Sequence, residues 1–156
     1  MIFTALAAAL LMSGCILLRP KYTYLDDISR RLGVKLSRGV VFEEDDRLDF
    51  QGWGYYYAEI DMSAAPLDLS DNENWRELPM EKEFSEFMLR ETDDFGRSLT
   101  APENGYWIFR NYSDDSNTSR SKDFVLHSSI DNWHYAAAFY DTDTATLTYW
   151  SRSVGH

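Results

Sequence analysis

The stretch Trp133-His-Tyr-Ala-Ala-Ala-Phe-Tyr-Asp141, the link Thr142-Asp-Thr144 and the run Ala145-Thr-Leu-Thr-Tyr-Trp-Ser151 decide the fold. Both runs are rich in residues that favour strands, and the link between them is short and polar. Two strands joined by such a link form a hairpin. The sequence therefore predicts an antiparallel pair at the C-terminal end of the chain.

Four further runs have the composition of strands, at residues 40–42, 55–60, 105–112 and 123–127. The first is expected to end at Glu43-Glu-Asp-Asp46, because four successive carboxylates repel one another and do not suit a sheet interior. Residues 63–77 have the composition of a loop. Short polar links between sequential strands favour antiparallel neighbours, because parallel neighbours need long crossovers.

Two short helices are expected beside these strands. The first begins at Thr23, whose spacing to Asp26 has the form of a capping box, and ends before Gly33. The second begins at Pro79, which fits a first helical turn. Its apolar stripe is Met80, Phe84, Phe87 and Met88. The predicted fold class is α+β: a twisted antiparallel sheet of about five or six strands with two short helices, one packed on a sheet face.

The N-terminus begins with an apolar run, Ile2 to Met12, and continues to Leu-Met-Ser-Gly-Cys15. An apolar segment followed by small residues is typical of a secretory signal. The last five residues resemble the lipobox of bacterial lipoproteins, in which Cys15 becomes the first mature residue. The resemblance implies a signal peptide at residues 1–14, a lipidated tether at 15–22 and a single globular domain at 23–156. The layout of the globular part is similar to that of many small bacterial lipoproteins, a likeness that implies no particular chemistry.

Two points about the membrane follow from the same segment. An uncleaved anchor from Ile2 to Leu18 stays open as an alternative, because its length is at the lower edge of what spans a bilayer. Ile16 stands where an aspartate would resemble an inner-membrane retention signal. We therefore expect a lipid-anchored protein of the cell envelope, in the outer membrane if the cell has one. Cys15 is the only cysteine, so no disulfide is expected.

The net charge of −11 is unevenly distributed. Up to Arg38 the chain carries six basic and two acidic residues, and beyond it nine basic and twenty-four acidic ones. The basic segment next to a lipidated Cys15 could be drawn to anionic headgroups, or could simply be a solvated helix. The acidic remainder excludes nucleic acid as an expected partner, because no basic face neutralises phosphates.

His127, Asp131 and His134 fall within eight residues. Two histidines and a carboxylate can hold zinc or ferrous iron if their side chains converge. A triad of Ser128 or Ser129 with His134 and Asp131 can also be written, but no Gly-x-Ser-x-Gly turn supports it. Histidines in strands more often pack on a partly buried face, so we expect structural histidines and no cofactor.

Carboxylates and aromatic residues lie side by side between residues 43 and 59, which is typical of a sugar-binding or glycoside-cleaving groove. The predicted ligand-binding side chains are Trp53, Tyr55, Tyr57 and Asp49, with Glu59 as a second candidate acid. A calcium site in the acidic run or at Asp141-x-Asp143 is a further reading, although neither has the pattern of a calcium loop. A solvated acidic sheet edge explains the same residues.

Two functions remain after these exclusions. The first is a lipid-anchored, non-enzymatic binding or inhibitor-type protein whose acidic aromatic surface meets a basic protein partner. The second is an envelope glycan-binding protein or weak hydrolase that uses the Trp53, Tyr55 and Tyr57 side. The charge pattern is stronger than any catalytic pattern, so the sequence favours the first.

Overall fold

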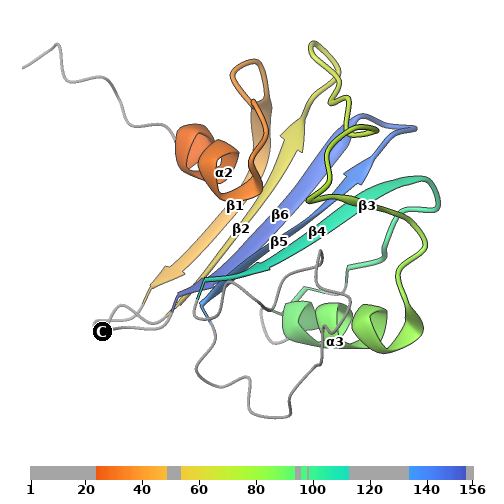
Figure 1. Ribbon diagram of the computed structural model, residues 1–156. Coiled ribbons are helices and arrows are strands. Elements are labelled where there is room, and N and C mark those ends of the chain that lie inside the picture. The colour runs from red at the N-terminus through yellow and green to blue at the C-terminus, as the bar shows by residue number, and fades with distance from the viewer. Residues whose placement is uncertain (1–23, 49–53, 94–95, 98, 113–133, 154–156) are drawn as a thin grey trace, which may run out of the picture.

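The computed structural model describes residues 24–48, 54–93, 96–97, 99–112 and 134–153, and these residues form one twisted sheet with a helix on each face (Figure 1). The helices are α2 (Tyr24–Leu32) and α3 (Lys82–Asp93). The strands are β1 (Val40–Leu48), β2 (Gly54–Asp61), β3 (Arg76–Glu77), β4 (Gly105–Asn111), β5 (Tyr135–Asp141) and β6 (Thr146–Ser153). The sheet is antiparallel in the order β1-β2-β6-β5-β4-β3, which confirms the predicted α+β class.

The predicted C-terminal hairpin is confirmed as β5 and β6, which pair from Tyr135↔Arg152 to Asp141↔Thr146. The Asp141 carboxylate accepts hydrogen bonds from the backbone N–H groups of Asp143 at 2.8 Å and Thr144 at 3.3 Å. This is an Asx turn, in which an aspartate side chain replaces a backbone acceptor. The turn therefore accounts for the spacing of Asp141 and Asp143 without a calcium ion.

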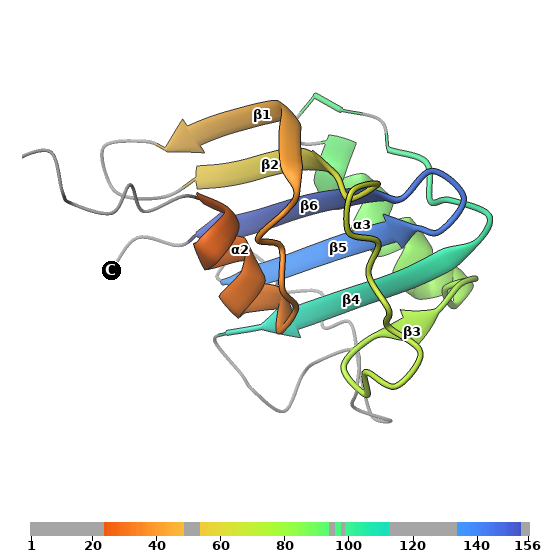
Figure 2. The same ribbon diagram turned by 90° about the horizontal axis from the view of Figure 1, so that it is seen from above.

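Each face of the sheet buries its own core, as Figure 2 shows from above. On the α2 face, Ile28 and Leu32 pack over small side chains such as Ala136 and Ala138. On the α3 face, Phe87 and Met88 pack against large rings. Those rings are Trp107, Phe109, Tyr135, Phe139 and Trp150. Successive strand residues point to opposite faces, so β5 and β6 supply both cores.

The C-terminal end of α2 is fixed by the sheet and by its own cap. Gly33 has a φ of 67°, and the N–H of Val34 donates to the Ser29 carbonyl at 3.1 Å, as in a Schellman motif. The Arg31 carbonyl accepts hydrogen bonds from Arg110 at 2.8 Å and from the Tyr112 hydroxyl at 3.0 Å. These contacts hold α2 over the end of β4.

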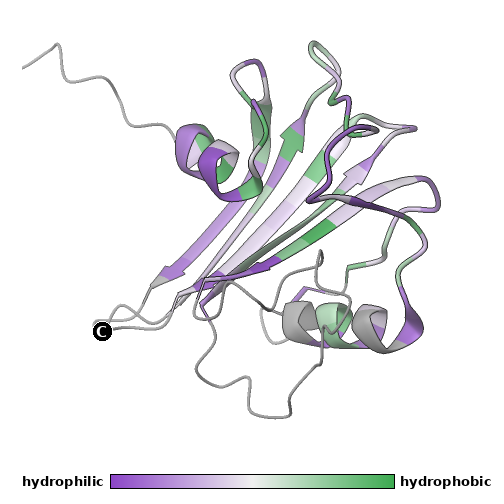
Figure 3. Ribbon diagram, in the orientation of Figure 1, coloured by the Kyte–Doolittle hydropathy of each residue, from purple (hydrophilic) through white to green (hydrophobic). Residues whose placement is uncertain are grey.

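The prediction that the first strand stops at Glu43 was wrong, because β1 continues through the acidic run to Leu48. Figure 3 shows this hydrophilic half of the strand. β1 is an edge strand, so its side chains reach solvent on both faces and need not enter a sheet interior. Its carboxylates alternate between the faces, which separates neighbours in sequence.

The predicted start of the second helix was also wrong, because α3 begins at Lys82 and not at Pro79. The chain before it is tied to β4: Arg76 and Glu77 form β3, and the N–H of Leu78 donates to the Gly105 carbonyl at 3.0 Å. The predicted loop at 63–77 therefore ends in a short strand. Leu69 and Trp75 of this loop are buried, and Leu67 packs half-buried against the same core.

Several predictions fall outside the described residues. They concern the signal peptide and tether, including Cys15, the expected strand at 123–127, and the candidate residues Asp49, Trp53, His127 and Asp131. Within the described part of the chain, no helix is both long and apolar enough to cross a bilayer.

Candidate functional site

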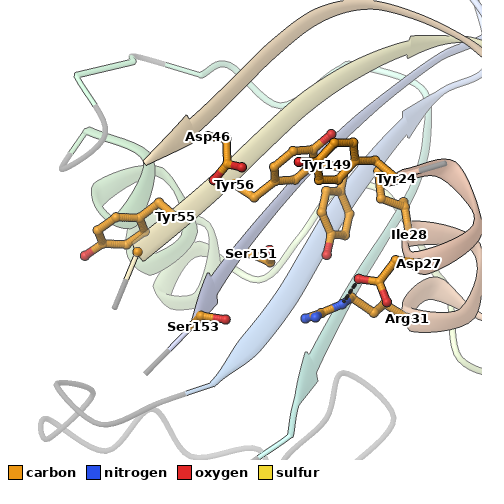
Figure 4. A pocket seen from close by; sticks show the side chains of 11 residues that line it. Tyr24, Asp27, Ile28, Arg31, Asp46, Tyr55, Tyr56, Tyr149, Ser151 and Ser153 are labelled. Carbon is orange, nitrogen blue, oxygen red and sulfur yellow. Dashed lines mark hydrogen bonds and ion pairs between the residues drawn. The ribbon is translucent and has the colours of Figure 1, made fainter. Parts of the chain in front are cut away.

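A hollow of about 140 Å³ lies on the α2 face, between α2 and the strands β1, β2 and β6 (Figure 4). We call it the α2 hollow. Successive turns of α2 contribute side chains to this hollow, because residues three, four and seven positions apart lie on the same helix face. Its lining is Tyr24, Asp27, Ile28, Arg31, Asp46, Gly54, Tyr55, Tyr56, Tyr149, Ser151 and Ser153.

Three tyrosines form its upper wall. The rings of Tyr24 and Tyr56 are stacked, with centroids 5.1 Å apart and planes 14° apart, and the Tyr149 ring lies 6.0 Å from that of Tyr56. Tyr24 is 56% exposed, whereas Tyr149 is buried. Burial, with the Glu44 carboxylate nearby, raises the pKa of Tyr56, and burial raises the pKa of Tyr149. Both hydroxyls therefore stay protonated.

The helix side of the α2 hollow carries two guanidinium groups on one carboxylate. Asp27 accepts hydrogen bonds from Arg30 and from the Nε of Arg31, the latter at 2.6 Å. Burial alone would raise the pKa of Asp27, but the bonds from Arg30 and Arg31 outweigh it, and the pKa is lowered. The Arg31 guanidinium also lies 5.6 Å from the centre of the Tyr112 ring. This end of the α2 hollow is therefore positively charged.

The opposite side carries carboxylates without a cation. Asp46 pairs in register with Tyr56, and Glu44 with Ala58, so both side chains lie on the α2 face. Neither forms an ion pair with any residue that the structure describes. Asp46 is exposed at the mouth of the α2 hollow. This edge is therefore negatively charged and open to solvent.

Ser151 and Ser153 follow Tyr149 at every second position of β6 and complete the floor. The Ser153 Oγ lies 3.4 Å from the Nε2 of His134, whose ring meets the Tyr112 ring edge-on at 6.0 Å. The described residues contain no group of three metal-ligating side chains. His134 packs against Tyr112 and Ser153, while the other two residues of the predicted cluster, His127 and Asp131, lie outside the described residues.

The sequence-predicted residues Tyr55 and Tyr57 lie on the other side of β2 and pack with the α3-face core. Tyr57 is only 2% exposed, its hydroxyl donates to Glu59, and the Arg97 guanidinium lies 4.1 Å from its ring centre. Arg152 lies 5.5 Å from the ring centre of Tyr55. Tyr57 therefore offers almost no surface to a ligand, and of the two predicted tyrosines Tyr55 alone reaches the α2 hollow, while Trp53 and Asp49 lie outside the described residues.

Sequence reasoning missed Tyr24, Arg31, Tyr56 and Tyr149 as a group. Strand alternation places Tyr56 and Tyr57 on opposite faces of β2, and a separation of seven residues places Tyr24 and Arg31 on one side of α2. What the sequence did not contain was the docking of α2 over β4 and β5, beside a hollow above β2 and β6. Alternating aromatic residues do not indicate which face of the strand remains accessible to a ligand.

A second hollow, of about 580 Å³, lies between residues 33–38 and 65–72. Lys35 and Arg38 stand at its rim, and no aromatic ring lines it. It lacks the combination of rings, hydroxyls and opposite charges found in the α2 hollow. The α2 hollow is therefore the stronger candidate site.

Comparisons of the chain with protein-family models, with curated proteins and with solved structures found no match. The chemistry of the α2 hollow is set by its own lining residues. Those residues provide aromatic surface, hydroxyl groups and charges of both signs, which suit binding.

Proposed function

We propose that this protein is a non-enzymatic binding protein of the bacterial cell envelope, attached to a membrane by a lipid on Cys15. In this proposal the α2 hollow receives a cationic group of a basic protein partner. The Leu-Met-Ser-Gly-Cys15 pattern supports the anchor, and the site supports the binding role.

One observation carries the binding role: Glu44 and Asp46 lie beside the stacked rings of Tyr24 and Tyr56 and form no ion pair with the residues that the structure describes. A cation near a tyrosine face gains about 0.5–2 kcal/mol, depending on how far it is desolvated. An adjacent carboxylate adds to that attraction. The site thus combines the two groups that favour an ammonium or guanidinium group.

The rest of the chain supports a basic partner. The acidic excess beyond Arg38 creates a negative field that speeds the approach of a basic protein at low salt. A toxin or cell-wall enzyme with a basic surface has the required charge, and the role would then be that of an inhibitor or immunity protein.

The binding role is tested with a lysine-rich peptide and the full-length protein in detergent. We expect binding that weakens steadily as salt rises. Tyr24→Ala, which removes one ring of the stack, should weaken binding about two- to thirtyfold. Phe42→Ala is the matched control, because Phe42 is as exposed as Tyr24, at 56%, but does not line the α2 hollow. Equal losses in the two variants would count against the α2 hollow.

The same protein should be tested on insoluble peptidoglycan. Retention that survives high salt and disappears in Trp53→Ala would contradict the basic partner and support a glycan-binding protein. No retention at high salt is the result expected from the proposal.

The anchor is tested by the intact mass of the protein extracted from membranes. We expect loss of residues 1–14 and a gain of acyl mass in the wild type, and neither change in Cys15→Ala. Recovery of the wild type with its initial methionine and a free thiol would contradict the anchor.

A further inference from the structure

We propose that the ligand of the α2 hollow is a zwitterion, with a carboxylate held by Arg31 and an ammonium group held by Asp46 and the tyrosine stack. The inference rests on the proposed function, since it places the same cationic group in the same hollow. It adds a negative charge to the ligand and specifies the distance between its two charged groups.

The positive end of the α2 hollow has donor capacity to spare. Arg31 uses its Nε for Asp27, and its terminal nitrogens form no hydrogen bond with the residues that the structure describes. Its side chain is 26% exposed. Figure 4 shows the guanidinium extending from α2 into the hollow on the side of Ser153. A guanidinium in this position can bind a carboxylate through two parallel hydrogen bonds.

Hydroxyl groups surround the same end. Tyr149, Ser151 and Ser153 point to one face of β6, and Figure 4 shows the Tyr149 hydroxyl directed down toward this space. Because burial raises the pKa of Tyr149, its hydroxyl keeps its proton and can donate. Asp27 is shared between Arg30 and Arg31, so one carboxylate does not cancel both guanidinium charges. An anionic group is therefore favoured here and would be repelled at the other end.

The negative end is formed by different residues. Asp46 stands at the mouth beside Tyr24 and Tyr56, and Glu44 lies two residues earlier on the same side of β1. A cation placed near Arg31 would be repelled, so an ammonium group belongs at the Asp46 end. The two ends of the α2 hollow thus select opposite charges.

The helix sets the distance between these ends. Tyr24 and Arg31 are seven residues apart on α2, which is about 10 Å along the axis. Both side chains extend into the α2 hollow, so the charges of a ligand should be somewhat closer than this. Ordinary bond lengths place the two charged groups of ε-aminocaproate about 7.5 Å apart. Lysine, with its carboxylate and side-chain ammonium, has a similar span, and a C-terminal lysine of a partner would present the same pair.

Calorimetry with the full-length protein in detergent tests the zwitterion directly. The probes are ε-aminocaproate, hexylamine without the carboxylate, caproate without the amine, and the shorter γ-aminobutyrate. We expect ε-aminocaproate to bind at least about tenfold more tightly than each of the other three, since each lacks a charge-assisted contact or cannot reach both ends.

Variants assign each end. Arg31→Gln should make ε-aminocaproate and hexylamine equivalent, and Arg31→Lys should restore part of the difference. Asp46→Asn should make ε-aminocaproate and caproate equivalent. Asp45→Asn is the control, because Asp45 lies on the opposite face of the same strand and should leave all four affinities unchanged. Unaltered thermal melting of Arg31→Gln and Arg31→Lys would show that the fold is retained.

Two outcomes would overturn the inference in different ways. If the lysine-rich peptide binds but hexylamine equals ε-aminocaproate, the zwitterion is wrong and the cationic ligand stands. If neither the peptide nor any probe binds, the proposed function fails with it.

Discussion

The two faces of β1 differ in what becomes of their carboxylates. On the α3 face, Glu43 forms an ion pair with Arg97, and Asp45 lies 2.8 Å from Arg47. On the α2 face, Glu44 and Asp46 have no cationic partner among the described residues. Four successive acids in the sequence are thus two separate pairs in the structure, one neutralised and one available.

The neighbouring tyrosines of β2 repeat the contrast. Tyr57 is buried beneath Arg97, while Tyr56 lines the α2 hollow and stacks on the exposed Tyr24. Neighbouring residues of a strand point to opposite faces, so one tyrosine belongs to the α3-face core and the next lines the candidate site. Composition alone therefore overstates how much of an acidic aromatic segment can meet a ligand.

The largest expected difference between the faces is in stability. Tyr57→Ala removes a buried ring from the α3-face core and should lower the free energy of unfolding by about 3 kcal/mol. Tyr24→Ala removes a half-exposed ring and should cost about 1 kcal/mol or less. Urea denaturation followed by tryptophan fluorescence measures both. Equal losses would mean that the two rings are equally part of the core.

The next largest effect concerns Arg97. Arg97→Gln should lower the free energy of unfolding by about 1–2 kcal/mol, because it removes the cation paired with Glu43 and uncovers the Tyr57 ring. The loss is limited because the Glu43 side chain is partly exposed to solvent. Arg47→Gln should cost less than about 0.5 kcal/mol, since Arg47 is more exposed. Denaturation at low and high salt measures both losses. A larger loss for Arg47 would contradict this account of the α3 face.

The smallest expected effect is a pH dependence on the α2 face. The pKa of Asp27 in the folded protein is below its ordinary value of 3.8, so its ionised form stabilises the fold above that pH. This contribution is lost as the pH falls through the lowered pKa. It should amount to about 1 kcal/mol or less, because the contacts with Arg30 and Arg31 are partly exposed.

Asp27→Asn tests this contribution by unfolding at about pH 6 and about pH 3. The variant should be less stable than the wild type at the higher pH, and this difference in the free energy of unfolding should be smaller at the lower pH. A constant difference between the two proteins at both values would exclude ionisation of Asp27 as the cause.

Local patterns in the sequence predicted much of the fold. The burial of Phe87 and Met88, the C-terminal hairpin and the opposite faces of Tyr56 and Tyr57 all follow from helix and strand periods, whereas Met80 joins the same core from outside α3. Each of these depends on neighbours within a few residues, which is the range over which a sequence pattern is informative.

The open face could not be predicted because it depends on contacts between distant segments. Arg97 neutralises Glu43 across more than fifty residues, and α2 covers β5 and β4 because Arg110 and Tyr112 bind the end of the helix. The strand boundary failed for a related reason. Four successive acids repel one another and so predicted the end of the strand. In an edge strand, however, their side chains alternate between the two sheet faces, and both faces are open to solvent there.

The most direct test measures a lysine-rich peptide on two double variants of β1. Glu44→Gln with Asp46→Asn should weaken peptide binding at least about tenfold and leave the free energy of unfolding within about 0.5 kcal/mol of the wild type. Glu43→Gln with Asp45→Asn should destabilise the protein and leave binding to the folded form unchanged. If both double variants weaken binding equally, all four carboxylates attract the peptide alike. That result would contradict the claim that only the carboxylates on the α2 face bind it.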